Sequence, residues 1–401
     1  MLHRTAAEAA VAGHRADELV VPGVKRHFSR FLSADPERLH AAAHSHHPWP
    51  DVTFDAQQQA WRDAAALHDA KWEHILGAVV PEARGHVARL LNLPDPATVT
   101  FAPNTHEFVM RILSCLPVPT RMLTTGAEFY SLARQALRLE EAGLAEVERV
   151  PAEPFSTFAE RFASAAARGG HDLVYLSQVL FDSGFALDDL AGIVGAVRDP
   201  ETFVVIDGYH GFMARPTDLG AVHERAFYLA GGYKYAMAGE GACFLHCPPG
   251  YGPRPLNTGW FAEPGDLRRG EQVSYAADGS RFAGATLDPT GLYRFNAVQR
   301  LLLDQGVGVA AIHSHAERLQ AQLCERLEQL GLPEPIATTS RGNFLAFRLN
   351  GAAELDARLR ERKVVTDHRG DRWRVGFGIY HDPEDIDELC ARLASIRAVA
   401  W

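Results

Sequence analysis

The sequence contains few cysteines and no long apolar run, and both absences limit what the protein can be. Its five cysteines form no Cys-x-x-Cys pair and are odd in number, which argues against a disulfide framework. No apolar run reaches about 18 residues, and the alanine-rich N-terminus carries charges throughout, so we expect neither a membrane span nor a secretory signal. These features predict a cytoplasmic protein with no membrane partner.

The sequence also lacks any concentration of charge of one sign. Its 40 basic and 50 acidic residues are interspersed and give a formal net charge of −10, with no basic stripe. Nucleic acid is therefore not the predicted partner. The hydrophobic fraction of 47% over 401 residues is ordinary for a soluble globular protein with a large core and a smaller second domain. A small-molecule substrate is the better prediction.

The sequence pattern changes twice from one end to the other. Residues 1–50 are predicted to form an N-terminal arm. Between residues 51 and 288, short apolar runs such as TFVVID alternate with helical stretches, which predicts a large α/β domain with a mainly parallel sheet covered on both faces. Residues 289–401 begin with a long helical region and continue with short strands and a closing helix. This predicts a smaller α+β C-terminal domain, against which the arm could pack.

Two strands that should be buried are each followed by a charge. The run FVVI ends on Asp207, and 27 residues later the run AFYLAGG leads into Lys234. Ligands of open parallel sheets lie at the carboxyl ends of the strands, so both side chains can point into one crevice. A desolvated lysine becomes a nucleophilic amine that forms Schiff bases, and a carboxylate keeps a pyridine nitrogen protonated. Pyridoxal 5'-phosphate (PLP) needs this pair, and the alternative is a plain salt bridge.

Other residues could complete a PLP site. In FAPNTHEF a strand end leads into a helix start, where the N–H groups of Thr105 and His106 could bind a phosphate or serve only as a helix cap. Phe129 could stack on the cofactor ring or belong to the core. His210, three residues after Asp207, could lie over or beside the ring and take part in catalysis, although a lone histidine is often structural.

With these residues in view, the segment DGYH followed by GGYKY resembles the aminotransferase class V branch of the fold-type I PLP enzymes, which includes kynureninases and cysteine desulfurases. The resemblance extends over about residues 95–395 and implies the PLP-dependent transferase fold, like that of aspartate aminotransferase. It also implies that Asp207 binds the pyridine nitrogen and that Lys234 carries the cofactor as an aldimine. Tyr233 would reach the phosphate, as in kynureninases.

The segment RFAGATLDPTGLYRF is similar to a family segment that meets the phosphate of the neighbouring subunit. Thr286 is kept here, whereas Ala285 replaces the usual glycine. The resemblance therefore implies a homodimer with shared active sites. The segment NTGWFAEPG keeps only Trp260 of the Trp-Gly-His segment of kynureninases, and we predict that this tryptophan contacts the cofactor.

The C-terminal segments RGNFLAF and VVTDHRGDRWRVGFGIYHDPEDID resemble the kynureninase pattern. The resemblance implies that Arg374 binds the substrate α-carboxylate, a task suited to its planar fork, with Asp367 and Arg369 bracing the site. Cysteine desulfurases carry a nucleophilic cysteine on the loop before this arginine. The loop VVTDHRGDRW has none, so persulfide chemistry of that kind is not expected.

The segment HSHHPWPD stands where kynureninases carry a Gly-Asn-Ser-Leu-Gly type of sequence. His44, His46 and His47 could contact the substrate, or they could be structural residues of the arm. A metal site with Asp51 is conceivable, but the spacing fits no common template, so no metal is predicted.

Together these features predict a PLP-dependent enzyme that acts on an α-amino acid. The favoured reaction breaks a C–C or C–S bond in the side chain of the substrate, as a kynureninase-like hydrolase or lyase would. The alternatives are a class V aminotransferase or an epimerase. A non-catalytic protein with the same fold is less favoured, because it would have no need to keep Asp207, Lys234 and Arg374.

Overall fold

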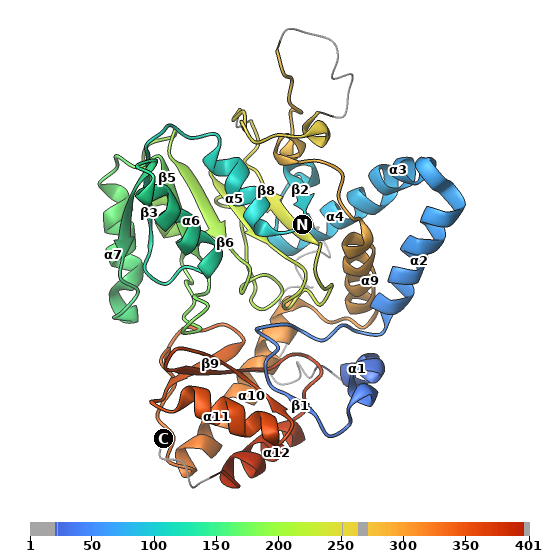
Figure 1. Ribbon diagram of the computed structural model, residues 1–401, viewed down its shortest axis with the longest axis vertical. Coiled ribbons are helices and arrows are strands. Elements are labelled where there is room, and N and C mark those ends of the chain that lie inside the picture. Colours follow the sequence, from blue (N-terminus) through green and yellow to red (C-terminus); the bar gives the residue numbers. More distant parts are fainter. Residues whose placement is uncertain (1–20, 22, 251, 264–271, 397–401) are drawn as a thin grey trace, which may run out of the picture.

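A computed structural model describes residues 21–396 except 22, 251 and 264–271. The first 20 residues of the predicted arm lie outside this part of the protein. The described residues form a large α/β domain, a smaller domain below it in the view, and an arm segment that runs between them (Figure 1). No helix in the described ranges combines the length and apolar character needed to cross a bilayer.

A seven-stranded sheet forms the centre of the large domain, in the order β2-β8-β7-β6-β5-β3-β4. The strands are β2 (Val99–Ala102), β3 (Thr120–Thr125), β4 (Ala145–Val150), β5 (Leu173–Ser177), β6 (Phe203–Asp207), β7 (Ala226–Ala230) and β8 (Cys243–His246). Only β8 runs antiparallel to its neighbours, so the predicted mainly parallel sheet is confirmed.

The sheet is buried on both faces because its strands are apolar at nearly every position. In β6, Val204 and Ile206 enter one hydrophobic cluster, while Phe203 and Val205 enter the cluster on the opposite face. Helices α5 and α6 cover the second face, and α4, α7, α8 and α9 cover the first. Since side groups alternate along a strand, Asp207 points to the face that α5 and α6 cover.

The helices differ widely in length. They are α1 (Ser29–Ala34), α2 (Val52–Leu67), α3 (Lys71–His74), α4 (Val80–Leu91), α5 (Thr105–Leu113), α6 (Tyr130–Glu141), α7 (Phe158–Ala167), α8 (Leu190–Ala196), α9 (Thr290–Asp304), α10 (Val309–Gln329), α11 (Ala352–Glu361) and α12 (Pro383–Ala394). Helix α9 packs against α2 and contributes to the core of the large domain, although it follows the predicted boundary at residue 289. The domain limits therefore stay a prediction.

The smaller domain packs three helices on an antiparallel sheet of order β11-β12-β9. Its strands are β9 (Phe344–Arg348), β11 (Asp367–Arg369) and β12 (Arg372–Gly376). Trp373 and Phe347 lie at the centre of its core together with residues of α10, α11 and α12. Asp382 and Asp385 form a capping box at the start of α12, which satisfies N–H groups that have no partner inside the helix.

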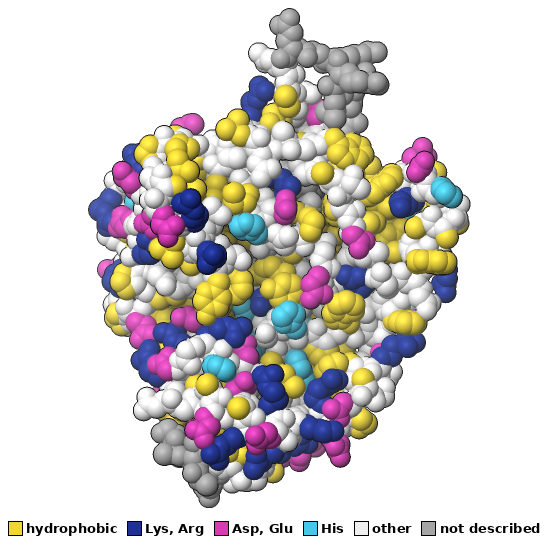
Figure 2. All heavy atoms as spheres, viewed as in Figure 1, with side chains coloured by type: hydrophobic (Ala, Val, Ile, Leu, Met, Phe, Trp, Pro, Cys, Tyr) yellow, Lys and Arg dark blue, Asp and Glu magenta, His cyan; other side chains and the backbone are white. Residues whose placement is uncertain are grey.

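The arm segment joins the two domains. Its short strand β1 (Leu39–His40) pairs in parallel with β10 (Val364–Val365), and Leu39 enters the core of the smaller domain. A few residues later the backbone N–H of His47 donates to the carbonyl of Tyr233 in the large domain at 3.0 Å. Hydrophobic side chains and histidines gather along the band where the upper and lower parts of the molecule meet (Figure 2). The arm therefore runs directly past Lys234.

Candidate active site

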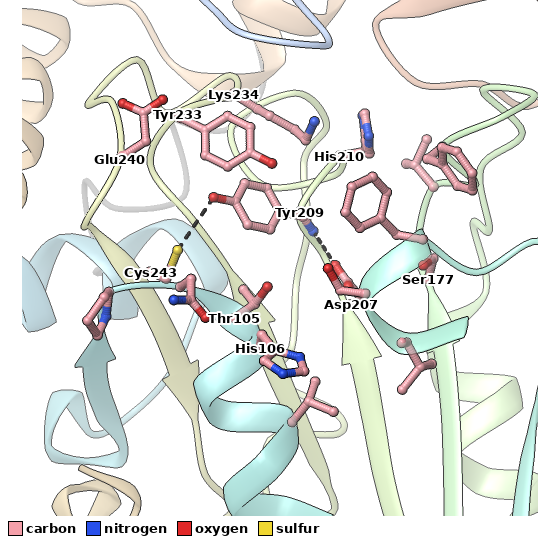
Figure 3. A pocket seen from close by; sticks show the side chains of 18 of the residues that line it. Thr105, His106, Ser177, Asp207, Tyr209, His210, Tyr233, Lys234, Glu240 and Cys243 are labelled. Carbon is pink, nitrogen blue, oxygen red and sulfur yellow. Dashed lines mark hydrogen bonds between the residues drawn. The ribbon is translucent and has the colours of Figure 1, made fainter. Parts of the chain in front are cut away.

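A cavity of about 240 Å³ lies where β5 and β6 end and α5 begins. Polar and aromatic side groups from several elements point into it (Figure 3). Seven of the predicted site residues line it: Thr105, His106, Phe129, Asp207, His210, Tyr233 and Lys234. The fold therefore brings residues more than 120 positions apart in the sequence into one small space.

Asp207 is fixed by two donors at the end of β6. Its Oδ2 accepts a hydrogen bond from the Tyr175 hydroxyl, and its Oδ1 accepts one from the backbone N–H of Tyr209, both at 2.9 Å. Burial raises the pKa of Asp207, and these two hydrogen bonds offset part of that effect. A cationic ring nitrogen placed against this carboxylate would stabilise its ionised form.

Lys234 follows β7, and the residue is only 7% exposed. Its Nζ donates to the carbonyl oxygens of His44 at 3.0 Å and Ser45 at 3.4 Å, both in the arm segment. Burial and the nearby positive charge of Arg374 lower its pKa to about 7. A lysine with this pKa is a free amine in a large fraction of molecules at neutral pH, as a Schiff-base lysine must be.

Asp207 and Lys234 share the cavity without touching each other. Among the described residues, no hydrogen bond or ion pair joins the two side groups, since each has other partners. The alternative of a plain salt bridge is therefore wrong. The two opposite charges are left free to contact different atoms of one bound group.

The N-terminus of α5 supplies the third part of the cavity. Helix α5 begins at Thr105, and Asn104 caps it, with its Oδ1 accepting from the N–H of Glu107 at 3.1 Å. Across the cavity the rings of Tyr233 and Tyr209 lie 4.8 Å apart, and burial raises the pKa of Tyr233 to about 12. A helix N-terminus faced by protonated hydroxyl groups is suited to an anion such as a phosphate.

His210 is buried beside Lys234. Its ring packs against Phe344 with 5.3 Å between the ring centres, and its Nδ1 is buried with no hydrogen-bond partner in the described residues. Burial and the positive charges of Lys234 and Arg374 hold the pKa of His210 well below its ordinary value. The neutral imidazole can therefore form a hydrogen bond through Nδ1 with a group bound beside it.

Arg374 lies at the edge of this site in the middle of β12, and its guanidinium is buried. Asp367 on the neighbouring strand binds it side-on: Oδ1 accepts from Nε at 2.8 Å, and Oδ2 accepts from Nη2. The remaining nitrogen, Nη1, donates to the carbonyl of Phe181, a cavity residue. The predicted bracing role of Asp367 thus has a specific geometry.

The other predicted site residues do not line the cavity. His46 is exposed and stacks on Tyr233 with 4.9 Å between ring centres, whereas His47 is buried and its Nδ1 donates to the carbonyl of Pro48. Trp260 and Thr286 are hydrogen-bonded to each other and do not line this cavity. Their predicted contacts with a cofactor, which for Thr286 involve a second subunit, stay predictions.

Several residues of the cavity are not among those predicted from the sequence. Tyr175 was one of them, although it lies two positions before the end of β5 and therefore on the same face as Asp207. Tyr209 and Phe181 also line the cavity, and both follow strand ends. Their positions in the sequence could have indicated this, because residues just beyond the carboxyl ends of parallel strands face the ligand crevice.

Comparison with known proteins fits this geometry. The family model for aminotransferase class-V matches residues 42–389, which is most of the chain. The chain belongs to this family. Enzymes of the family use PLP, so the predicted cofactor and fold are confirmed.

Several relatives are named for sulfur chemistry. A probable cysteine desulfurase of Vibrio cholerae is 23% identical over 234 residues, which are 51% of this chain and 53% of that protein, so the match spans about half of that relative. A lysine-to-alanine mutant of C-DES with glycine covalently linked to PLP superposes with a TM-score of 0.80 at 21% identity, over 92% of this chain and 98% of that chain. The complex of the cystine C–S lyase C-DES with its product cysteine persulfide gives 0.77 at 21% identity, over 91% and 98%.

The residues present fit PLP. Lys234 provides an amine that is partly neutral, Asp207 a carboxylate for the ring nitrogen, and the start of α5 an anion site, all around one cavity. Phe129 lines the same cavity and presents an aromatic ring. The kynureninase likeness stays a prediction, because the relatives described above are cysteine desulfurases and a C–S lyase.

The lowered pKa of Lys234 predicts how cofactor loading depends on pH. An ordinary lysine with a pKa of 10.5 becomes more reactive up to strongly alkaline pH, whereas Lys234 with a pKa of about 7 is mostly neutral just above pH 7. The rate at which apoprotein forms its covalent link to PLP should therefore rise between about pH 6 and 8 and then level off. Stopped-flow absorbance measures this rate, with N-acetyl-lysine methyl amide as control. A rate that keeps rising to pH 10 contradicts the prediction.

Replacement of Lys234 should abolish the covalent link. Wild-type protein with PLP should absorb near roughly 410–430 nm, and borohydride should fix the cofactor to the peptide that contains residue 234. The variant Lys234→Ala should show no borohydride-fixed cofactor by mass spectrometry, and Lys71→Ala on α3 should behave like the wild type. Fixation in Lys234→Ala at another lysine would show that the assignment is wrong.

Proposed function

We propose that the protein is a PLP-dependent lyase that cleaves the bond between Cβ and sulfur in an S-substituted cysteine. The observation that carries the proposal is that Lys234, whose pKa is lowered to about 7, lines one cavity with Asp207 and lies close enough to Arg374 to feel its charge. This is the set of groups needed to handle the amine and carboxylate of an amino acid. The family and its sulfur-handling relatives support the choice of bond.

PLP, when bound, withdraws electrons from the α-carbon of an attached amino acid and so weakens the bonds around that carbon. Lys234 is the residue that can accept the proton from the α-carbon, because its Nζ lies in the cavity and its pKa is near neutral. Asp207 would supply the negative charge that keeps a proton on the ring nitrogen of a bound PLP. Arg374 would bind the α-carboxylate and fix the orientation of the substrate.

The sulfur leaves as a free thiol in this proposal. Burial raises the pKa of all five cysteine thiols. Cys243, which lines the cavity, has its pKa raised to about 11. None is therefore poised as a thiolate to accept sulfur. The balanced reaction takes one S-substituted cysteine and one water to one thiol, pyruvate and ammonia. No oxidant or reductant is needed.

Three aromatic residues at the cavity edge favour an uncharged group on the sulfur. Phe181 meets Phe129 edge-to-face with 5.4 Å between the ring centres, and it meets Tyr130 at 5.1 Å. Phe129 and Tyr130 are 37% and 56% exposed, which is high for aromatic residues of their size. An apolar or aromatic substituent could bury this surface, whereas a charged one would lose its hydration there.

The kynureninase-like pattern of the C-terminal segments supports a second candidate, C–C cleavage with water as the nucleophile. Transamination and epimerisation use the same residues up to the loss of the α-proton, and they are distinguished by their products.

We also propose that the protein is a homodimer, since the exposed Trp260 and its partner Thr286 lie outside the cavity of their own subunit. A cytoplasmic location belongs to this proposal as well.

Product analysis tests the reaction. Holoenzyme incubated with S-benzyl-L-cysteine should release benzyl thiol, pyruvate and ammonia in equal amounts, measured by mass spectrometry and by coupled assays. Lys234→Ala is the matched inactive control. Alanine among the products would indicate a different cleavage, a keto acid that keeps the benzylthio group would indicate transamination, and the D-isomer would indicate epimerisation. Each of these contradicts the proposed elimination.

Loss of Arg374 should weaken substrate binding. Arg374→Lys keeps the charge but not the fork, so it should raise the KM for the amino acid about 10- to 100-fold while the cofactor remains bound. Arg358→Lys, which changes an exposed ion pair on α11, serves as the control. An unchanged KM in Arg374→Lys would show that the α-carboxylate binds elsewhere.

A further inference from the structure

His44 contacts one cationic group of the proposed site directly and is linked to the other through a carboxylate. Its backbone carbonyl accepts a hydrogen bond from Lys234 Nζ at 3.0 Å. Its imidazole Nε2 donates to Asp367 Oδ1 at 3.1 Å, and this carboxylate in turn binds Arg374. One residue of the arm therefore links the amine and the guanidinium that an amino acid would meet.

The imidazole of His44 is held rigidly. It is completely buried and stacks on Phe344 with 4.6 Å between ring centres and 17° between the planes. Gly376 closes off the ring as well: a Cβ atom there would lie 2.4 Å from Nδ1, so any larger residue would displace the ring. Burial lowers the pKa of His44 to about 4, so the ring is neutral at pH 7 and Nε2 must carry the proton that Asp367 accepts.

Asp367 is held as a carboxylate between His44 and two arginines. Burial opposes its ionisation, but His44 and Arg374 outweigh that effect and keep its pKa well below the usual range. Arg369 also approaches it, with 3.4 Å between Nη2 and Oδ2. Arg369 and Arg374 thus share the carboxylate of Asp367, which cannot by itself neutralise both guanidinium groups. Their positive charge favours the binding of a substrate carboxylate.

The orientation of Arg374 depends on this carboxylate. Side-on pairing uses Nε and Nη2, and the carbonyl of Phe181 holds Nη1. Without the donor on His44, Asp367 would keep its bonds to arginine but lose the contact that fixes its own position between β11 and the arm. The guanidinium would then be held by the Phe181 carbonyl and by a carboxylate that can shift, so its plane would be less precisely fixed for a ligand.

We infer that His44 is a positioning residue that, through Asp367, sets the orientation in which Arg374 binds the α-carboxylate of the substrate. The inference rests on the proposed function, since it requires an amino acid whose carboxylate meets Arg374. His44 thereby determines how strongly the protein prefers an amino acid over the corresponding amine without a carboxylate. Its backbone contact with Lys234 places the two binding groups at a fixed separation.

Binding of two ligands to holoenzyme tests the inference. S-benzyl-L-cysteine and 2-(benzylsulfanyl)ethylamine differ only in the carboxylate, and the change in cofactor absorbance gives the Kd of each. Wild type should bind the amino acid at least about tenfold more tightly than the amine. His44→Leu should lower this ratio by about tenfold, with the Kd of the amine changed less than about twofold. His44→Gln keeps an N–H donor and should restore much of the ratio.

Two further variants separate positioning from general damage. His86→Leu makes the same change on α4, away from the cavity, and should leave the ratio at the wild-type value. In an Asp367→Asn background, His44→Leu should alter the ratio by less than about twofold, because its effect passes through the carboxylate. Circular dichroism and bound cofactor are measured for every variant.

The possible results have distinct meanings. Equal weakening of both ligands in His44→Leu, or a ratio that does not change, overturns the inference while leaving the proposed function in place. A wild type that shows no preference for the amino acid overturns the role of Arg374 and the inference together. A full effect of His44→Leu in the Asp367→Asn background shows that His44 does not act through Asp367.

Discussion

The site depends on the burial of two opposite charges that do not pair with each other. A carboxylate and an amine in one cavity would ordinarily form an ion pair, which would offset much of the cost of removing them from water. Here Asp207 is held by Tyr175 and the backbone of Tyr209, and Lys234 is held by carbonyls of the arm. The free-energy cost of burying these charges is reflected in the raised pKa of Asp207 and the lowered pKa of Lys234. A bound cofactor that contacts both groups would reduce this cost.

Each part of the fold contributes to this arrangement. The parallel sheet carries Asp207 to the edge where strands end, and β7 leads into Lys234. The arm, anchored on the smaller domain by β1, supplies the carbonyl groups that bind Lys234 and the imidazole that binds Asp367. The smaller domain supplies Arg374 from the middle of a strand. The site is therefore assembled between domains, which suits an enzyme that must bind a cofactor and a substrate together.

Much of the fold and the chemical centre could be predicted from the sequence. Alternating apolar runs gave the parallel sheet, and a charge after a buried strand gave Asp207 and Lys234. The aromatic and hydroxyl residues around the cavity could not be found this way, because Tyr175 looks like any strand tyrosine until the register with β6 is known. The roles of His44, His46 and His47 could not be assigned either. Their different environments follow from packing between domains, which buries His44 and leaves His46 exposed.

We propose that the carboxylate of Asp207 and the amine of Lys234 hold opposite parts of one PLP molecule. A crystal structure of the protein reconstituted with PLP measures this directly. We expect continuous electron density from Lys234 Nζ to the cofactor, with the ring nitrogen within hydrogen-bond distance of Asp207. Density for PLP at another lysine, or a ring nitrogen turned away from Asp207, would contradict it.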